Sequence, residues 1–274
     1  MVDVHCHLNL HAFDKDFDEV AKRAFESGVT KIINVGTSIP SSRRAVELAH
    51  KYDNMYAIVG VHPHHADKAD REFEGEIQSD WLEKLEELAR EKKVVGIGEI
   101  GLDYYSYKSN GIVDKKVQEE AFLSQIKLAN KLKLPLQIHN RHAGADIIEI
   151  LKHHKADLLE VPGMFHCMSG DLNILEEVLS LGFYVGFDGN ITYKGIAKGE
   201  TVELSELVKH TPIERIVTET DSPFLTPVPK RGSRNEPAHV IIVGKFIAQL
   251  KNLPFEAVEE QTTVNAKKIF NLDI

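Results

Sequence analysis

Val2-Asp3-Val4-His5-Cys6-His7 opens the chain as a short apolar strand that ends in two histidines. Residues one apart on a strand point to the same face, roughly 6.5 to 7 Å apart, so both imidazoles can reach one cation. Taken alone, a His-X-His pair fits two polar residues at a strand end equally well. Similar apolar segments are closed by four more ligand-type residues, namely Glu99, His139, His166 and Asp221. These five coincidences together predict a metal site.

Apolar segments rich in Val, Ile and Phe alternate with amphipathic helical segments, which is typical of strand-helix units around a parallel sheet. The expected strands are Val2–His5, Lys31–Val35, Tyr56–Val61, Val94–Glu99, Leu136–His139, Met164–His166, Tyr184–Phe187 and Arg215–Glu219. The expected helices include Phe17–Ser27, Ser41–Tyr52, Asp80–Lys92, Val117–Leu132, Ala145–His153 and Leu172–Leu181. Ligands on strands from first to last favour an α/β fold closed into a (β/α)8 TIM barrel, because only a closed ring brings all those strand ends together. No composition break divides the chain, so residues 1–274 are expected to form a single hydrolase domain.

Charge and composition limit the classes of function. The formal net charge of −9 argues against a protein that coats nucleic acid electrostatically, but not against one that grips phosphate through metal ions. No run of 18 apolar residues and no leader pattern occur, which predicts a cytoplasmic protein without a membrane partner. Cys6 and Cys167 each stand next to a proposed ligand histidine at the end of an expected strand. Strand alternation turns their side chains away from the metal, and we interpret them as small buried hydrophobes rather than zinc thiolates.

Two carboxylates have the most specific expected roles. Glu99 lies in Gly96-Ile97-Gly98-Glu99-Ile100-Gly101-Leu102-Asp103, and its two oxygens can bridge two cations where an imidazole cannot. The glycines are expected to allow tight packing that aims Glu99 inward. Asp221 stands at a strand tip before Ser222-Pro223, where it can bind a metal and accept a proton from the attacking water. Glu219, two residues earlier, is interpreted as structural.

Three further residues are candidates for substrate binding. His62 and His64 form a second His-X-His around Pro63, and either bind substrate phosphate, complete a metal shell or are ordinary loop histidines. Arg141 follows His139 on the same side of its strand and can clamp a phosphate oxygen, although a surface ion pair is the alternative. Tyr104 and Tyr105 lie close enough in sequence to Glu99 for base stacking.

These motifs together resemble the TatD family of metal-dependent deoxyribonucleases, in the family's order and over almost the whole chain. The matching stretches are Asp3-Val4-His5-Cys6-His7-Leu8, Gly60-Val61-His62-Pro63-His64, Gly98-Glu99-Ile100-Gly101-Leu102-Asp103-Tyr104, Pro135-Leu136-Gln137-Ile138-His139-Asn140-Arg141, Phe165-His166-Cys167, Glu219-Thr220-Asp221-Ser222-Pro223, Arg231-Gly232 with Asn235-Glu236-Pro237, and Asn265-Ala266. The resemblance implies a TIM barrel and metal-dependent phosphodiester hydrolysis on DNA, often as an exonuclease. By position, it places His5, His7, Glu99 and Asp221 on one metal, and Glu99, His139 and His166 on the other. Met168 stands where the family usually has an aromatic residue, and Asp188 where it usually has serine.

The resulting hypothesis is a hydrolase with two divalent ions (Mg, Mn or Zn) that activate water, with Glu99 as the bridge and Asp221 as the base. Arg141 and His64 steady the developing charge, and His62 contacts the substrate. The expected partner is DNA, single-stranded or at ends, bound by a monomer. Two alternatives stay open: an amide, lactone or aminoacyl-tRNA ester hydrolase on the same barrel, and a non-catalytic binding protein.

Overall fold

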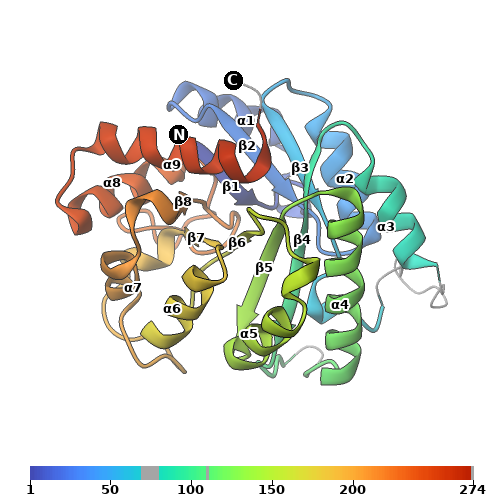
Figure 1. The fold of residues 1–274 in the computed structure, drawn as a ribbon. Coiled ribbons are helices and arrows are strands. Elements are labelled where there is room, and N and C mark those ends of the chain that lie inside the picture. Colours follow the sequence, from blue (N-terminus) through green and yellow to red (C-terminus); the bar gives the residue numbers. More distant parts are fainter. Residues whose placement is uncertain (69–79, 109–110, 273–274) are drawn as a thin grey trace.

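The computed structural model describes residues 1–68, 80–108 and 111–272, in which strands and helices alternate (Figure 1). The strands are β1 (Val2–Cys6), β2 (Lys31–Val35), β3 (Met55–Val59), β4 (Val94–Asp103), β5 (Leu136–Arg141), β6 (Gly163–Phe165), β7 (Tyr184–Phe187) and β8 (Ile216–Thr218). The helices are α1 (Phe17–Glu26), α2 (Ile39–Ala49), α3 (Trp81–Ala89), α4 (Lys115–Leu132), α5 (Gly144–His153), α6 (Leu172–Ser180), α7 (Leu204–His210), α8 (Val240–Lys251) and α9 (Phe255–Phe270).

The eight strands form one parallel sheet in the order β1 to β8. The sheet closes just beyond the end of β8, where Cys6 and Ser222 form a parallel bridge. The Ser222 carbonyl accepts a hydrogen bond from the His7 amide at 2.8 Å, and the Asp221 amide donates to the His5 carbonyl at 2.9 Å. The expected (β/α)8 TIM barrel is thereby confirmed, and its closing contacts lie at the residues that carry the proposed ligands.

Most predicted elements lie within a few residues of the observed ones. The largest difference is β4, which continues to Asp103 instead of ending at Glu99. In the other direction, β8 covers only Ile216–Thr218, so Asp221 lies three residues beyond its strand. Helices α7, α8 and α9 were absent from the predicted set. The ligand-bearing loops are therefore as important to the site as the strands themselves.

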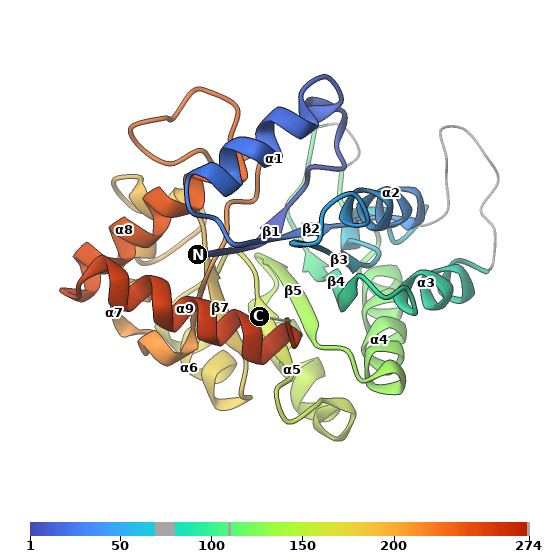
Figure 2. The same cartoon turned by 90° about the horizontal axis from the view of Figure 1, so that it is seen from above.

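The two faces of most strands pack in different cores. In β2, Ile32 packs in the large cluster that the surrounding helices cover, whereas its neighbour Ile33 packs in a second cluster with Val2 of β1 and Ile269 of α9. This alternation is what a strand with both faces buried requires. Helix α9 contacts β1, β6 and β8 and lies across the end of the barrel near the N-terminus (Figures 1 and 2). One end of the barrel is thus covered by a helix, and the other is left for the site.

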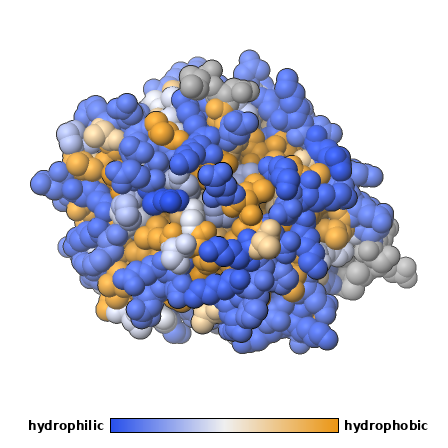
Figure 3. All heavy atoms as spheres, viewed as in Figure 1, coloured by the Kyte–Doolittle hydropathy of each residue, from blue (hydrophilic) through white to orange (hydrophobic). Residues whose placement is uncertain are grey.

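The surface offers no broad apolar face in the view of Figure 3, where hydrophobic residues form small patches separated by hydrophilic ones. Within the described residues, no helix has the length and apolar character needed to cross a membrane.

Gly163 in β6 provides the first testable prediction, on stability. Its φ is +131°, and a Cβ there would lie 1.9 Å from the carbonyl oxygen of Leu136 in the neighbouring strand. Replacing Gly163 by Ala must therefore displace backbone as well as strain φ, and we expect the free energy of unfolding to fall by about 3 kcal/mol or more. Urea unfolding followed by circular dichroism measures this change.

Gly28 is the matched control for that substitution. It also has a positive φ, of +100°, but a Cβ there meets nothing within 4 Å. Gly28→Ala should cost only the backbone strain, about 1 to 2 kcal/mol. Equal losses in the two variants would show that the close approach of β5 to β6 does not limit the side chain at position 163.

Candidate metal centre

The carboxyl ends of the strands bring all the predicted ligands to one end of the barrel. Five strands supply them: His5 and His7 from β1 and its end, Glu99 from β4, His139 from β5, His166 directly after β6, and Asp221 after β8. All except Asp221 and His139 are buried, and those two keep 15% and 14% of their side-chain surface exposed. In a TIM barrel this end is where loops converge to form the active site.

His5 and His7 point the same nitrogen at each other. Their Nε2 atoms lie 3.0 Å apart. The Nδ1 of His5 lies 2.8 Å from the Oε1 of Gln137, and the amide of Gln137 is oriented by its own donation to the Val4 carbonyl. The Nδ1 of His7 lies 2.9 Å from the carbonyl of Val35. Both Nδ1 atoms thus face acceptors and carry a proton, so two Nε2 lone pairs face each other whenever both rings are neutral, and a proton on either ring turns the contact into a hydrogen bond.

A cation between these two nitrogens relieves the repulsion of their lone pairs. The Oδ1 of Asp221 lies 3.3 Å from the Nε2 of His7 and 3.6 Å from that of His5. Burial lowers the pKa of His7, but Asp221 and Glu99 outweigh burial and raise it. The same two carboxylates that attract a proton to this position would attract a divalent metal ion.

Glu99 divides its two carboxylate oxygens between two groups of histidines. Its Oε2 lies 3.8 and 3.7 Å from the Nε2 atoms of His5 and His7. Its Oε1 lies 2.7 Å from the Nδ1 of His139 and 3.3 Å from the Nε2 of His166. Both sets place three donor atoms within 4.8 Å of one another. This geometry is what a carboxylate needs in order to bridge two cations.

Burial and the opposite charges of the donor set shift the pKa values of its members in different directions. Burial raises the pKa of Glu99, but the neighbouring histidines, His62 and His166 first, outweigh it and hold that pKa well below its usual range. Burial and the nearby His166 and His7 lower the pKa of His5 well below its usual value. Neighbouring carboxylates outweigh burial and raise the pKa of His7, His139 and His166. A divalent cation held here with the ionised Glu99 would therefore take the place of protons that these carboxylates stabilise on the rings.

The glycines around Glu99 have the packing role expected of them. A Cβ on Gly98 would lie 2.7 Å from the Cβ of Gln137 in β5. A Cβ on Gly60 would lie 2.5 Å from the carbonyl oxygen of Gly98. The absence of side chains lets the strands on both sides approach β4 closely, which places Glu99 among the histidines.

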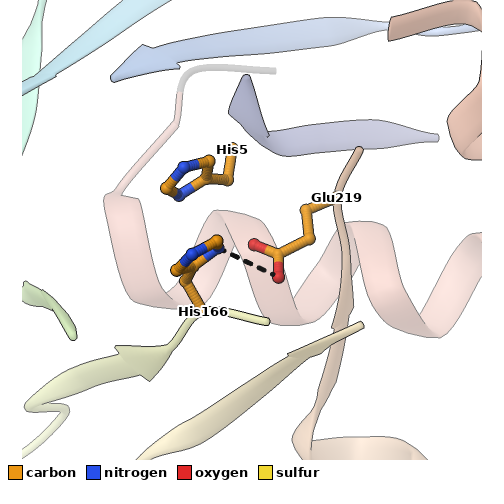
Figure 4. Close-up of side chains that lie close together, drawn as sticks. All are labelled: His5, His166 and Glu219. Atoms are coloured by element: carbon orange, nitrogen blue, oxygen red, sulfur yellow. Dashed lines mark ion pairs between the residues drawn. The ribbon is translucent and has the colours of Figure 1, made fainter. Parts of the chain in front are cut away.

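Two further carboxylates lie behind the second pair of histidines. The Oδ2 of Asp103 lies 3.2 Å from the Nε2 of His139, on the side of the ring away from Glu99. The Oε1 of Glu219 lies 3.5 Å from the Nδ1 of His166, and Figure 4 shows this carboxylate pointing at the ring of His166, which stacks on His5. A carboxylate behind a ligating imidazole fixes its orientation and its tautomer. The structure thus gives Glu219 a place beside the site as well as in the core, and it adds Asp103, for which the sequence suggested no role.

His62 and His64 lie at the edge of the second group. The Nδ1 of His62 accepts a hydrogen bond from the His64 amide at 3.1 Å, so the proton of a neutral His62 is on Nε2, which lies 3.5 Å from the Oε1 of Glu99. Burial holds the pKa of His62 well below its usual value. With its proton facing inward, His62 is arranged as a donor rather than as a metal ligand. The Nε2 of His64 lies 3.2 Å from the Oδ2 of Asp103.

Arg141 is held over two tyrosines. Its Nη1 donates to the Tyr107 hydroxyl at 2.7 Å, and its guanidinium carbon lies 4.1 Å from the ring centre of Tyr105. Tyr107 in turn donates to Asp103 at 3.1 Å. Burial raises the pKa of Asp103, but its contacts with His139 and neighbouring donors outweigh this and lower it to about 2, so Asp103 stays charged. The hydrogen bonds from Arg141 to Tyr107 and from Tyr107 to Asp103 therefore fix the Arg141 guanidinium at the rim of the site.

A cavity of about 860 Å³ opens over the donor atoms, with Glu99, His139, His166 and Asp221 in its wall. Its wall includes Tyr107, which had not been singled out from the sequence. It does not include Tyr104, whose hydroxyl donates to Asp146 at 2.8 Å outside the cavity wall, so the base-stacking role considered for Tyr104 has no structural support.

The two departures from the family pattern lie outside the donor set. Asp188 is fully buried and does not line the cavity. Burial and the nearby Glu219 raise its pKa to about 8, so it is largely uncharged at neutral pH and does not repel a polyanion. Met168 is buried in the main core. Cys6 is buried and Cys167 is partly buried, and burial raises the pKa of both thiols well above the usual value, which disfavours the thiolate.

A TIM barrel that presents imidazole and carboxylate donors from the ends of its strands defines a class of metal-dependent hydrolases. Comparison with known proteins gives the family, since residues 2–271 match the family described as TatD related DNase. The chain therefore belongs to the TatD family of metal-dependent hydrolases.

Individual relatives agree with this placement over their full length. The chain is 41% identical to the uncharacterized metal-dependent hydrolase YabD of Bacillus subtilis, with 100% of each chain covered. It is 32% identical to the 3'-5' ssDNA/RNA exonuclease TatD of Klebsiella pneumoniae, covering 100% of this chain and 99% of that protein. Among solved structures, YJJV, a TatD homolog from Escherichia coli, superposes with a TM-score of 0.86 at 28% identity, covering 100% of this chain and 98% of the other.

Proposed function

We propose that this hydrolase cleaves phosphodiester bonds of DNA, as an exonuclease on single strands or at ends, with two divalent ions held by the six converging residues. Glu99 is the bridge, with Oε2 toward His5 and His7 and Oε1 toward His139 and His166. That division of one carboxylate between two donor groups is the observation that carries the proposal. The name of the Klebsiella relative supports a nucleic-acid substrate.

The chemistry divides between the ions and the chain. Bound divalent ions supply a lowered pKa for the attacking water and a positive charge next to the phosphate oxygens. The chain contributes Asp221, whose carboxylate is beside both histidines of β1 and is exposed enough to accept a proton from that water. Arg141, fixed by Tyr107, offers a guanidinium to the phosphate, and His62 and His64 offer ring protons on the same side, with the ring centre of His64 4.0 Å from that of Tyr107.

The site accounts for a phosphate substrate despite the negative net charge of the chain. Asp188 is largely uncharged, and the charged Asp103 lies behind His139 and outside the cavity wall, so Glu99 and Asp221 are the two proposed carboxylate ligands that line the cavity. We also propose that residues 1–274 act as one domain and as a monomer.

The direct test uses metal-stripped protein resupplied with magnesium, manganese or zinc. The substrates are 5′-labelled and 3′-labelled single-stranded DNA and, for comparison, a blunt duplex that contains the same strand. We expect metal-dependent shortening from one end, at least 1000-fold faster than without metal, and slower on blunt duplex. The labelled ladders give the polarity. Intact DNA with every metal, together with turnover of an ester, lactone or aminoacyl-tRNA panel, would overturn the nuclease proposal and leave the hydrolase class in place.

A further inference from the structure

Phe224 is a large hydrophobic side chain that is 53% exposed in the wall of the metal-centre cavity. Its ring centre lies 6.4 Å from that of His7, at an interplanar angle of 65°. A single exposed hydrophobic residue on a protein surface needs no explanation. One that stands next to a proposed metal ligand, inside the cavity where the substrate must bind, is in a position to contact that substrate.

The backbone of Phe224 is held rigidly. Its amide donates to the Asp221 carbonyl at 2.9 Å. The fully buried side chain of Asn235 donates to the carbonyls of Phe224 at 2.6 Å and Thr220 at 2.8 Å, and the Asn235 amide donates to the Pro223 carbonyl at 3.1 Å. One buried asparagine thus fixes both the Asp221 segment and the residue that follows it. A phenylalanine whose backbone is fixed in this way has only two side-chain torsions to order on binding, so it loses little conformational entropy.

Basic side chains share the cavity wall with this ring. Lys194 and Lys198 lie in the loop after β7, and Arg231 lies in the loop after β8, with its guanidinium carbon 4.0 Å from the ring centre of Tyr193. Arg141 is the last residue of β5, two strands away from β7 in the sheet order. The cavity wall therefore carries four Lys and Arg side chains against three carboxylates (Glu99, Glu200 and Asp221), a balance of +1 in a chain whose formal net charge is −9. This local reversal of charge complements a phosphate backbone that crosses the cavity.

An exposed aromatic ring beside a basic track is the combination that binds single strands, because the backbone follows the cations and a base stacks on the ring. We propose that Phe224 is the stacking platform for the nucleobase next to the scissile phosphate. The proposal rests on the proposed nuclease function and deepens it. A base in an intact duplex is already stacked and paired, so the ring selects an unpaired base, either in a single strand or at a frayed end.

The test compares oligonucleotides that carry a normal base or an abasic residue at each of the two positions nearest the cleaved end. Wild-type protein should prefer the base-bearing strand in kcat/KM by about tenfold at one of these positions. Phe224→Ala should abolish that preference by slowing the base-bearing strand alone. Phe224→Trp should keep it, and Phe224→Leu, the matched control for apolar volume, should not.

A second readout does not depend on turnover. In an Asp221→Asn background with the metal that supports wild-type turnover, a strand with terminal 2-aminopurine should lose fluorescence on binding, because stacking quenches this base. Phe224→Ala should remove the quenching while circular dichroism and thermal unfolding stay unchanged, as expected for a half-exposed side chain.

The outcomes separate the two proposals. If wild-type protein cleaves no nucleic acid, the function fails and with it the stacking role. If it cleaves single strands but Phe224→Ala slows base-bearing and abasic strands equally, the function stands and the stacking platform is wrong. A dimer in sedimentation that Phe224→Ala converts to monomer would also overturn the proposal, since the ring would then be covered by a second copy.

Discussion

Glu99→Gln is expected to lower kcat on single-stranded DNA about 1000-fold or more and to leave one tightly bound divalent ion instead of two. Glutamine keeps the shape of the side chain but replaces one oxygen by an NH2 group. Whichever group of histidines the NH2 faces then loses its anionic oxygen and meets two protons instead. Metal content after dialysis, measured by mass spectrometry, and steady-state kinetics on the same samples check both parts.

Glu200→Gln is the matched control. Glu200 lines the same cavity, but its Oε2 accepts a hydrogen bond from the Gly170 amide at 2.7 Å, which a glutamine oxygen can replace. This variant should keep both ions and stay within about twofold of wild-type kcat, because Glu200 is none of the six proposed ligands and its hydrogen bond to Gly170 is kept. If Glu99→Gln also kept two ions and full activity, Glu99 would not be the bridge.

The barrel was predictable because its strands have a pattern that local sequence reveals. A strand buried on both faces must be largely apolar, and five such runs in this chain, those of β1, β4, β5, β6 and β8, lead to a proposed ligand where the barrel opens. Helix α9 was harder to predict because it buries Thr262 and Asn265, which interrupt its apolar stripe. The side chain of Asn265 finds its partners only in the folded chain, at the carbonyls of Ile213 and Ile216.

The site was predictable to the extent that its residues end strands. His139 and His166 stand out in the sequence for that reason, whereas the carboxylates behind them do not. Asp103 comes four residues after Glu99, and its position beside His139 depends on β4 continuing past Glu99 and pairing with β5, with Gly101 opposite His139. Gln137 likewise looks like an ordinary polar residue in a strand. Its role is visible only in the closed barrel, where its side chain contacts Val4 and His5 of β1. The residues that orient a metal ligand come from other strands, so local sequence patterns do not reveal them.

Asp221→Asn is expected to lower kcat by about 100-fold to 10,000-fold without unfolding the protein, since general-base catalysis contributes in that range. The φ of Asp221 is +52°, a conformation that asparagine adopts as readily as aspartate. The backbone amide of residue 221 can still donate to the His5 carbonyl, and the side-chain oxygen still faces His7. The variant loses only the negative charge and the ability to take up a proton. Steady-state kinetics, metal content and thermal unfolding on one preparation check the prediction.

Asp188→Asn distinguishes loss of a base from loss of any nearby carboxylate. Because burial and Glu219 raise the pKa of Asp188 to about 8, that carboxyl is already largely uncharged at neutral pH, and an amide should change kcat little. If Asp221→Asn keeps its metal and its rate rises with pH, the lost function is proton uptake. The attacking water must then lose its proton to solvent, because no side chain accepts it. Loss of metal from Asp221→Asn would instead identify Asp221 as a ligand only, and wild-type kcat in that variant would exclude it from both roles.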